Sequence, residues 1–202
     1  MMTFKTDDVI IRRFQMRDAE QEDLNIFLYN NSNIVPDDVK IETGYGYKQK
    51  AKLVVKSAIN EYYTDEPIWA IENKETKRII GYIRVCNYSS KNKMCNLTWA
   101  MSNRHWDNGF MKDALVQIFN FMFTKRDVEL IECSYYQPDD SNNVILDEIG
   151  MTKEATLRAR RVNEHTKMKE NFIIYSISKE EFYQNFGSVV SSKHFRYLKR
   201  KI

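Results

Sequence analysis

The stretch NRHWDNGFMKDAL, residues 103–115, places a glycine between a polar segment and a run with helical spacing. Gly109 is one of only six glycines in the chain. It would allow a tight turn into a helix. It would also suit an anion site, because the first N–H groups of a helix have no acceptor within the helix and the helix dipole favours negative charge there. Both interpretations fit this stretch taken alone.

The composition indicates one globular domain with a basic end. The chain has 202 residues, of which 43% are hydrophobic and 13% aromatic. This is enough for a substantial core and too much for a disordered chain. The net charge of +3 does not demand a nucleic-acid partner, and five basic residues after Ser188 meet no acid. We expect a domain over residues 1–182 and a basic extension over residues 183–202, which is either a solvated terminal helix or the one part suited to RNA.

Other sequence signals exclude several classes of protein. No apolar run approaches the roughly 20 residues of a membrane-spanning helix, and the first residues lack the apolar core of a signal peptide. The cysteines and histidines show no metal-binding spacing. Cys86 and Cys95 could face each other across a hairpin, but we expect reduced packing residues. The sequence therefore predicts a cytoplasmic protein without a membrane partner or a metal ion, and it leaves monomer and homodimer open.

Hydrophobic periodicity predicts an α+β fold, an α/β/α sandwich whose mainly antiparallel, mixed sheet of about seven strands carries helices on both faces. The strands are expected at Val9–Arg13, Ile68–Glu72, Ile79–Cys86, Met94–Met101, Val128–Tyr135, Thr152–Val162 and Asn171–Ile177. The helices are expected from Asp18, at Lys48–Tyr63, from the quoted loop to Thr124, at Asp139–Glu148 and from Ser178. The strand–helix–strand order around the quoted stretch predicts one pair of parallel neighbours.

Local signals refine the helix ends and faces. Asp18 is expected to cap the first helix, Gly150 to end the fourth, and the SKEE sequence from Ser178 to form a capping box. Two helix faces are also predicted. The Lys48–Tyr63 helix should bury Leu53, Val54, Ala58 and Ile59, and the helix after the quoted loop should turn Lys112, Asp113, Gln117 and Asn120 outward.

Four segments, in the same order, resemble the GNAT superfamily of N-acetyltransferases, most closely the branch with the bacterial ribosomal-protein alanine and serine N-terminal acetyltransferases. They are WAIENKETKRIIGYI (69–83), WDNGFMKDAL (106–115), DEIGMTKEATLR (147–158) and YSISKEEF (175–182). The resemblance extends from about Val9 to Phe182. It implies the same α+β sheet, with a V-shaped splay between the two parallel strands.

The resemblance also implies acetyl-CoA as the cosubstrate. Backbone N–H groups of the glycine loop would bind the pyrophosphate, and the strand before the loop would hydrogen-bond the pantetheine. The cofactor-binding residues implied in this way are Met101, Ser102, Asn103, Asp107, Asn108, Gly109, Phe110, Met111, Lys112 and Asn142.

The chain departs from the pattern of that branch at several positions. Asp107 replaces the usual glycine, so its side chain must point to solvent. Asp139 and Asn142 stand where an asparagine and a serine are usual. Leu146 occupies the position of a tyrosine that protonates the thiolate in many relatives, although a leucine there is ordinary for this branch. Asn96 replaces a carboxylate, and an amide cannot accept a proton at neutral pH. The Asn142 amide could donate a hydrogen bond to the departing thiolate.

Acetyl transfer to an amine needs a neutral amine and donors for the thioester carbonyl, and no nucleophilic residue. The candidate catalytic positions are therefore Asn96 and Asn142, and the base stays unassigned among Glu132, Asp139, Tyr135, Tyr136 and a water chain. Three aromatic residues could line an acceptor pocket or simply pack in the core, which we take as the default: Trp69, Tyr82 and Trp99.

Two functions remain. The first is an N-acetyltransferase that moves an acetyl group from acetyl-CoA to a primary amine, either a protein N-terminus or a small amine, by direct attack in a ternary complex. The alternative is a coenzyme-A-binding sensor or partner protein that has lost catalysis. Asn96, Asp139 and Asn142 are the features that favour the alternative.

Overall fold

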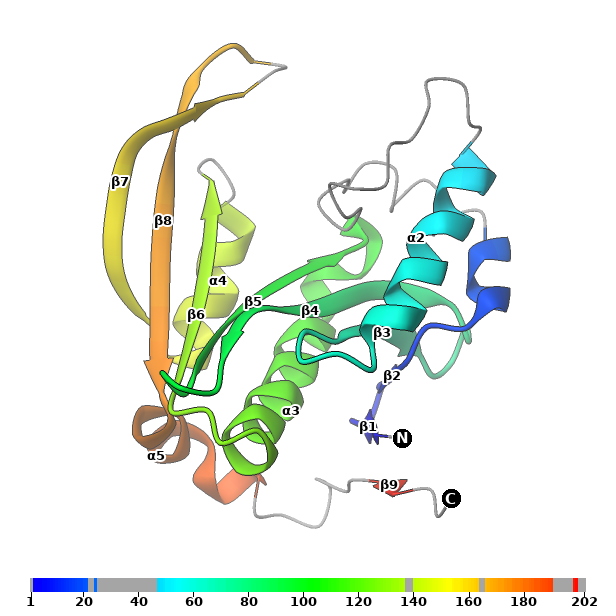
Figure 1. Ribbon diagram of the computed structural model, residues 1–202, viewed down its shortest axis with the longest axis horizontal. Helices are drawn as coiled ribbons and strands as arrows, with labels where there is room; N and C mark the ends of the chain where they lie inside the picture. Colours follow the sequence, from blue (N-terminus) through cyan, green and yellow to red (C-terminus); the bar gives the residue numbers. More distant parts are fainter. Residues whose placement is uncertain are drawn as a thin grey trace. The chain divides into compact units, whose positions relative to one another are not determined.

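The computed structural model describes residues 2–21, 24, 47–136, 140–163, 166–190 and 198–199, except for the side chains of residues 47, 48, 50, 107, 140–143, 198 and 199 (Figure 1). The chain forms two compact units. The first comprises Met1–Val85, Trp99–Phe110 and Phe195–Ile202, and the second Cys86–Thr98 and Met111–His194. Each unit is described by itself below.

The described part of the chain forms nine strands in the order β7-β8-β6-β5-β4-β3-β2-β1-β9. They are β1 (Met2–Lys5), β2 (Val9–Arg12), β3 (Ile68–Asn73), β4 (Ile79–Ser89), β5 (Met94–Met101), β6 (Leu130–Tyr136), β7 (Thr152–Val162), β8 (Lys169–Ser178) and β9 (Leu198–Lys199). The pair β5–β6 is parallel, as predicted, and the other registered pairs are antiparallel. The predicted α+β fold with a mixed open sheet is confirmed.

Six helices lie in the described residues. They are η1 (Met16–Glu20), α2 (Tyr47–Glu61), η3 (Asn103–Asn108), α3 (Phe110–Lys125), α4 (Asp140–Ile149) and α5 (Lys179–Val190), of which η1 and η3 are 3-10 helices. Within this part of the chain, no helix is both long and apolar enough to cross a membrane.

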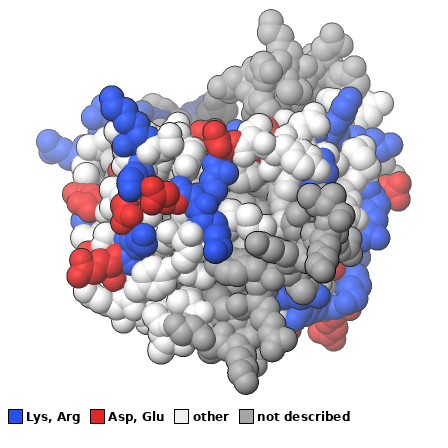
Figure 2. Space-filling view, turned by 60° about the horizontal axis from the view of Figure 1, so that its bottom comes forward, with Lys and Arg blue, Asp and Glu red and all other residues white. Residues whose placement is uncertain are grey.

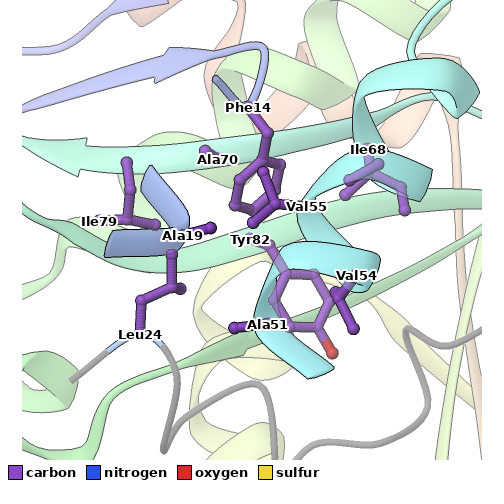
Figure 3. Close-up of a cluster of buried hydrophobic side chains, with 11 residues drawn as sticks. Phe14, Ala19, Leu24, Ala51, Val54, Val55, Ile68, Ala70, Ile79 and Tyr82 are labelled. Atoms are coloured by element: carbon purple, nitrogen blue, oxygen red, sulfur yellow. The ribbon is translucent and has the colours of Figure 1, made fainter. Parts of the chain in front are cut away.

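The first unit is built around a buried cluster between α2, η1 and the strands β3 and β4. Figure 3 shows the apolar side chains of α2 facing Ile68, Ala70 and Tyr82 of the sheet. The predicted stripe of α2 is only partly right: Val54 and Ala58 are buried, but Leu53 is 39% exposed. The helix α2 instead buries Ala51 and Val55, two residues that were not in the predicted stripe.

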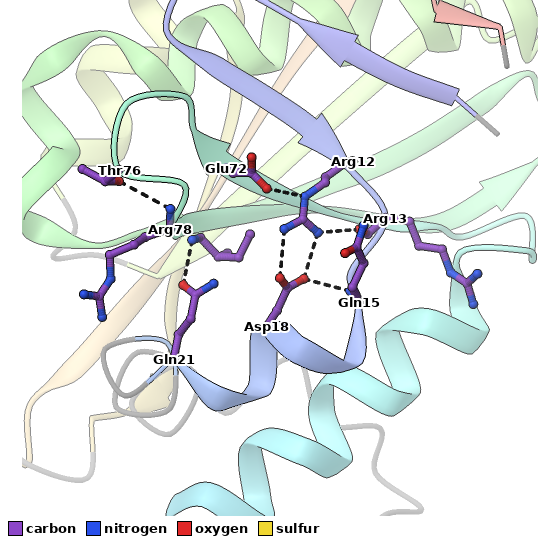
Figure 4. A network of polar contacts seen from close by, with 9 residues as sticks. Arg12, Arg13, Gln15, Asp18, Gln21, Glu72, Thr76 and Arg78 are labelled. Atoms are coloured by element: carbon purple, nitrogen blue, oxygen red, sulfur yellow. Dashed lines mark hydrogen bonds and ion pairs between the residues drawn. The ribbon is translucent and has the colours of Figure 1, made fainter.

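A buried ion-pair network joins β2, β3 and η1 in the first unit (Figure 4). The Arg12 guanidinium donates from Nε to Glu72 at 2.6 Å and from Nη1 and Nη2 to the two Asp18 oxygens at 2.8 Å. The Asp18 side chain also accepts the Gln15 N–H at 2.8 Å. Asp18 is thus the third residue of a capping box that begins at Gln15, and the prediction that it is the N-cap was wrong.

The network also sets the charge state of Arg12. Burial alone would lower the pKa of Arg12, but hydrogen bonds and charges from Asp18 and Glu72 outweigh it and raise that pKa. The guanidinium is therefore held as a cation inside the unit. A buried cation of this kind depends on both carboxylates staying in place.

The second unit packs α3 and α5 together. Phe182 of α5 lies with its ring centroid 6.1 Å from that of Phe119 and 5.3 Å from that of Phe123, both in α3. Gln117 and Asn120 are buried, so the prediction that they face outward was wrong. The reason is that α5 covers this side of α3, and the Tyr183 hydroxyl of α5 donates to the Asn120 side chain at 2.8 Å.

Two helix ends follow their sequence signals. Gly150 has φ +81° and ends α4, with the Met151 N–H donating to the Leu146 carbonyl at 3.0 Å. At the start of α5, the Ser178 N–H donates to Glu181 at 2.8 Å and the Glu181 N–H donates to the Ser178 hydroxyl at 3.2 Å. The predicted C-cap and capping box are confirmed.

We expect Ser178→Ala to lower the free energy of unfolding by about 1 kcal/mol, because an N-cap hydroxyl is lost. The hydrogen bonds from the Ser178 N–H and hydroxyl lower the pKa of Glu181. This stabilisation is complete above the unfolded-state pKa, near 4.3, and is lost as the pH falls through the lowered pKa. Urea unfolding from pH 7 to pH 3 should show a flatter profile for Glu181→Gln than for wild type. Glu180→Gln, in the same turn, should keep the wild-type slope, and equal slopes in both variants would contradict the prediction.

Candidate functional site

The quoted stretch folds as two helices joined at a glycine. Residues 103–108, expected to be a loop, form the 3-10 helix η3 directly after β5. Gly109 then takes the left-handed conformation, with φ 74° and ψ −4°, and α3 begins at the next residue. Glycine adopts this conformation without the steric penalty that other residues incur, so the conformation of the junction favours the residue found there.

The junction leaves room for a ligand beside the start of α3. A Cβ atom added to Gly109 would meet no heavy atom of the described residues within 4 Å, and Gly109 and Asn108 are both exposed. The first N–H groups of the 16-residue helix α3 have no acceptor within the helix, and the dipole of the helix is positive at this end. The residues therefore fit a phosphate or pyrophosphate group at this position.

Not every implied binding residue can contribute a side chain. Met101 and Met111 are 4% and 1% exposed, so only their backbone groups could reach a ligand. The Ser102 N–H donates to the Ile80 carbonyl at 2.8 Å and is already used. Asn103 and Asn108 are exposed and Phe110 is half-buried. The side chains of Asp107 and Asn142, and the whole of Asp139, lie outside the described residues.

The segment before α3 is held to β4 by its backbone. Besides the Ser102 bond, Gly81 of β4 faces β5 so closely that a Cβ atom there would lie 2.6 Å from the Ala100 carbonyl oxygen. Such a contact is shorter than real Cβ atoms make. The end of β5, from which η3 departs, is thus fixed by a position that admits only glycine.

Basic side chains accompany this segment. Arg104 is exposed, and His105 is half-buried with its ring centroid 6.4 Å from that of Phe110. Lys112 in the first turn of α3 forms an ion pair with Glu148 of α4 at 3.2 Å. Its ammonium already has a partner, which the sequence did not reveal, because the two residues lie far apart in the chain and follow no shared periodicity.

Asn96 lies opposite a carboxylate. In the parallel register of β5 and β6, Asn96 pairs with Glu132, and both side chains are half-buried. Paired residues of neighbouring strands project from the same face of the sheet. Glu132 is therefore the acid nearest in register to Asn96.

The register of β5 and β6 is short. It ends at Leu97↔Cys133, although β5 continues to Met101 and β6 to Tyr136. The splay implied by the family resemblance would start at this point. Leu146, which stands at the tyrosine position of many relatives, is fully buried and offers no proton donor.

The two buried thiols of the second unit, those of Cys95 and Cys133, are not nucleophiles. Cys86, Cys95 and Cys133 are free, so the reduced state predicted for them is confirmed. Burial raises the pKa of Cys95 to about 12 and that of Cys133 well above its ordinary value. Both are protonated at neutral pH, and only a thiolate is reactive. An acyl-cysteine intermediate has no support from these groups.

Two of the three aromatic residues considered for an acceptor pocket belong to the core. Trp69 is 2% exposed and makes edge contacts with Phe4 and Tyr62. Tyr82 is 5% exposed and lies in the cluster of Figure 3. Trp99 alone is half-buried, so the packing interpretation holds for the first two.

Comparison with known proteins agrees with this geometry. Residues 9–152 match the family described as "Acetyltransferase (GNAT) domain". The chain is 24% identical over 175 residues to the "Uncharacterized N-acetyltransferase YoaA" of Bacillus subtilis (strain 168), covering 87% of this chain and 96% of that protein.

Two solved structures are also similar. The ribosomal-protein-S5-alanine acetyltransferase from Vibrio fischeri has TM-score 0.70 at 16% identity, covering 89% of this chain and 98% of that one. RimJ of Mycobacterium smegmatis, in complex with CoA-disulfide, has TM-score 0.69 at 14% identity, covering 93% and 94%. At 16% and 14% sequence identity, these two similarities show a shared fold and nothing further. The family match covers more than half of the sequence, and the chain therefore belongs to the GNAT family and is an acetyl-CoA-dependent acetyltransferase.

Proposed function

We propose that the chain acetylates a primary amine, and that this amine is the α-amino group of a protein N-terminus. The observation that carries the proposal is the glycine junction between η3 and α3. Its open, left-handed Gly109 and the positive end of the α3 helix dipole suit the pyrophosphate of coenzyme A. The backbone N–H groups of Asp107–Lys112 would hold it, and the end of β5 at Met101 would contact the pantetheine.

The reaction is a direct transfer. The neutral amine attacks the thioester carbonyl carbon, a C–N bond forms, the C–S bond breaks, and coenzyme A leaves as a thiol after taking up a proton. Backbone donors can stabilise the charge that develops on the carbonyl oxygen. The buried, protonated cysteines support a mechanism without an acyl-enzyme.

Asn96 bears on which amine is acetylated. It cannot remove the proton from an ammonium group, so the acceptor must arrive partly neutral or lose its proton elsewhere. At pH 7.4 a lysine-like amine with pKa ~10.4 is neutral in about one molecule per thousand, whereas an α-amine with pKa ~8 is about one-fifth neutral. This favours a protein N-terminus, which is also what the names of the similar ribosomal-protein acetyltransferases suggest.

The saturating rate should rise with pH until the acceptor is neutral, and Asn96→Glu should move that rise to lower pH. The measurement is the rate of free-thiol release from pH 6.5 to 9, with the chemical step shown to limit turnover. Thr98→Glu, on the same face of β5, is the matched control and should not shift the profile. A flat wild-type profile would mean that another residue of the protein removes the proton from the acceptor ammonium. Glu132, which lies opposite Asn96, would be tested first.

We expect Asn142→Ala to lower turnover more than it weakens acetyl-CoA binding. Asn142 lies in α4, and its amide would donate to the departing thiolate, an interaction that strengthens as the C–S bond breaks. Calorimetry gives the dissociation constant for acetyl-CoA, and steady-state kinetics give the turnover rate. An equal loss in both would instead make Asn142 a binding residue.

The alternative function is a coenzyme-A-binding sensor or partner subunit without turnover. The substitutions at Asn96, Asp139 and Asn142 favour it. A panel of peptides with free N-termini, polyamines and small amines, assayed by thiol release, separates the two functions. Binding of acetyl-CoA without turnover of any acceptor would establish the alternative.

Acceptor and partners follow from the same proposal. Lys and Arg side chains lie among Asp and Glu side chains on the face shown in Figure 2, and the net charge is only +3. Mixed charge of this kind suits a small or peptide acceptor better than a polyanion. We propose a cytoplasmic enzyme, monomeric or homodimeric, that needs no metal ion, with any RNA contact confined to the basic tail.

The division into a domain at 1–182 and an extension at 183–202 is part of the proposal. Helix α5 continues through that boundary to Val190, and β9 pairs with β1 through Met2↔Lys199 and Thr3↔Leu198. The extension thus contains ordered elements. Its function would be tested by removing residues 191–202 and measuring both stability and RNA binding.

A further inference from the structure

The described part of the chain contains a buried indole donor for which it supplies no hydrogen-bond acceptor. It is the indole N–H of Trp99, whose nitrogen is shielded from solvent although the residue as a whole is half-buried. Tryptophan offers this single donor and no acceptor. Buried donors without partners are rare in native proteins, because such a group has given up its bonds to water and gained nothing.

Other buried polar atoms of this kind belong to side chains that interact in other ways. Arg13 donates from Nη2 to the Ile59 carbonyl at 2.9 Å, and Glu61 lies 3.4 Å from an Arg84 nitrogen. Trp69 lies against the Tyr62 hydroxyl: burial raises the pKa of Tyr62, and a hydrogen bond with Trp69 opposes that shift. Trp99 differs because the described residues give its single polar side-chain atom no hydrogen bond and no other polar interaction.

The position of Trp99 links this donor to the candidate site. Trp99 lies on β5, beyond Leu97, the last residue in register with β6. It shares a face of the strand with Leu97 and Met101, since strand side chains alternate. Ser102 and η3 follow directly, so the donor lies on the segment that leads to the glycine junction.

The chemistry of the donor indicates the group that it would bind. An indole N–H is neutral and sits in a desolvated position, which suits a neutral acceptor such as a carbonyl oxygen. An anion finds better partners at the start of α3, where the helix dipole and several N–H groups converge. The pantetheine arm of acetyl-CoA carries two amide carbonyls and ends in a thioester carbonyl.

We propose that the Trp99 indole N–H donates a hydrogen bond to a carbonyl oxygen of the acetylated pantetheine arm. This rests on the proposed function, because it requires that the chain bind acetyl-CoA. Trp99 becomes a substrate-binding residue, a role that a tryptophan in a sheet does not suggest. Its missing partner in the free protein is then supplied by the substrate.

Trp99→Phe tests the proposal by removing the donor while keeping an aromatic ring. The dissociation constant for acetyl-CoA, measured by calorimetry, should rise roughly three- to tenfold, the usual net effect of one hydrogen bond. The urea midpoint of the free protein should not fall in proportion, since no bond is lost there. Trp69→Phe is the matched control: it should leave the dissociation constant unchanged and lower the midpoint, because its ring is 2% exposed and its N–H is engaged.

Two ligands distinguish the carbonyl groups. If the indole binds a pantetheine amide, Trp99→Phe weakens coenzyme A and acetyl-CoA equally. If it binds the thioester, only acetyl-CoA is weakened. Both results support the proposal, and unchanged affinity for both ligands overturns it.

A direct readout uses wild-type protein and does not depend on how the variant folds. The chain has three tryptophans, so an indole N–H NMR spectrum has few peaks to assign. The Trp99 peak should move downfield in the proton dimension when acetyl-CoA is added, as a hydrogen bond forms. If wild type binds no acetyl-CoA, the proposed function fails too. If it binds and the Trp99 peak stays in place, only this inference fails.

Discussion

Gly109→Asn should weaken acetyl-CoA binding at least about 100-fold while changing the free energy of unfolding by less than about 0.5 kcal/mol. Asparagine tolerates the left-handed conformation at φ 74° better than other side chains do. Its side chain would project into the open space beside the start of α3. Losing two charge-assisted hydrogen bonds of about 1.5 kcal/mol each corresponds to a factor of more than 100.

Two further substitutions separate the ligand effect from strain. Gly109→Val should weaken binding as well, but it adds roughly 1–2 kcal/mol of backbone strain, because a branched residue is disfavoured at positive φ. Gly187→Asn, at a helical glycine whose added Cβ would also meet nothing within 4 Å, is the matched control and should leave affinity unchanged. Wild-type affinity in Gly109→Asn would show that the phosphates bind elsewhere.

Asp18→Ala should lower the free energy of unfolding by about 3–5 kcal/mol, the cost of leaving a buried charge without its partner. Arg12 would lose both hydrogen bonds to Asp18 and keep those to Glu72 and to the Arg13 carbonyl, in a site where Arg12 and Asp18 are 8% and 1% exposed. The Gln15 N–H would lose its acceptor as well. Urea unfolding followed by circular dichroism measures the loss.

A surface pair and a double variant serve as controls for the Asp18 prediction. Glu129→Gln removes the exposed partner of Lys179 and should cost less than about 1 kcal/mol. Adding Arg12→Ala to Asp18→Ala should cost less than Arg12→Ala alone, because the two residues share one interaction. Fully additive losses would mean that Asp18 stabilises η1 on its own and that the ion pair contributes little.

Much of the fold was predictable because its signals are local. Strand β7 was predicted with its exact bounds, and the caps at Gly150 and Ser178 follow from residue types that favour one backbone conformation. Strands β1 and β9 were missed. They contain four and two residues, too few to show an alternating pattern.

Tertiary contacts explain the errors. Asp18 looked like an N-cap, but its carboxylate accepts hydrogen bonds from Arg12 of β2 and from the N–H of Gln15, which is the actual N-cap. Gln117 and Asn120 looked exposed, but both are buried, and Tyr183 of α5 donates a hydrogen bond to Asn120. Neither partner can be read from the periodicity of the element itself.

The candidate site divides in the same way. Gly109 could be singled out from sequence, since glycine at a helix start has a specific backbone meaning. The use of the Ser102 N–H by Ile80 and the pairing of Lys112 with Glu148 could not, because each joins separate elements. The same is true of the Trp99 indole, whose lack of a partner is a property of the folded chain.

The close approach of Gly81 to the Ala100 carbonyl affects how this protein can diverge. The contact is between main chains, so it does not depend on which side chains β4 and β5 carry. Side chains in both strands can therefore change during evolution without moving the end of β5, from which η3 departs. Position 81 is the exception, since any side chain there would push the strands apart. The neighbouring positions can accept substitutions only because residue 81 has no Cβ atom.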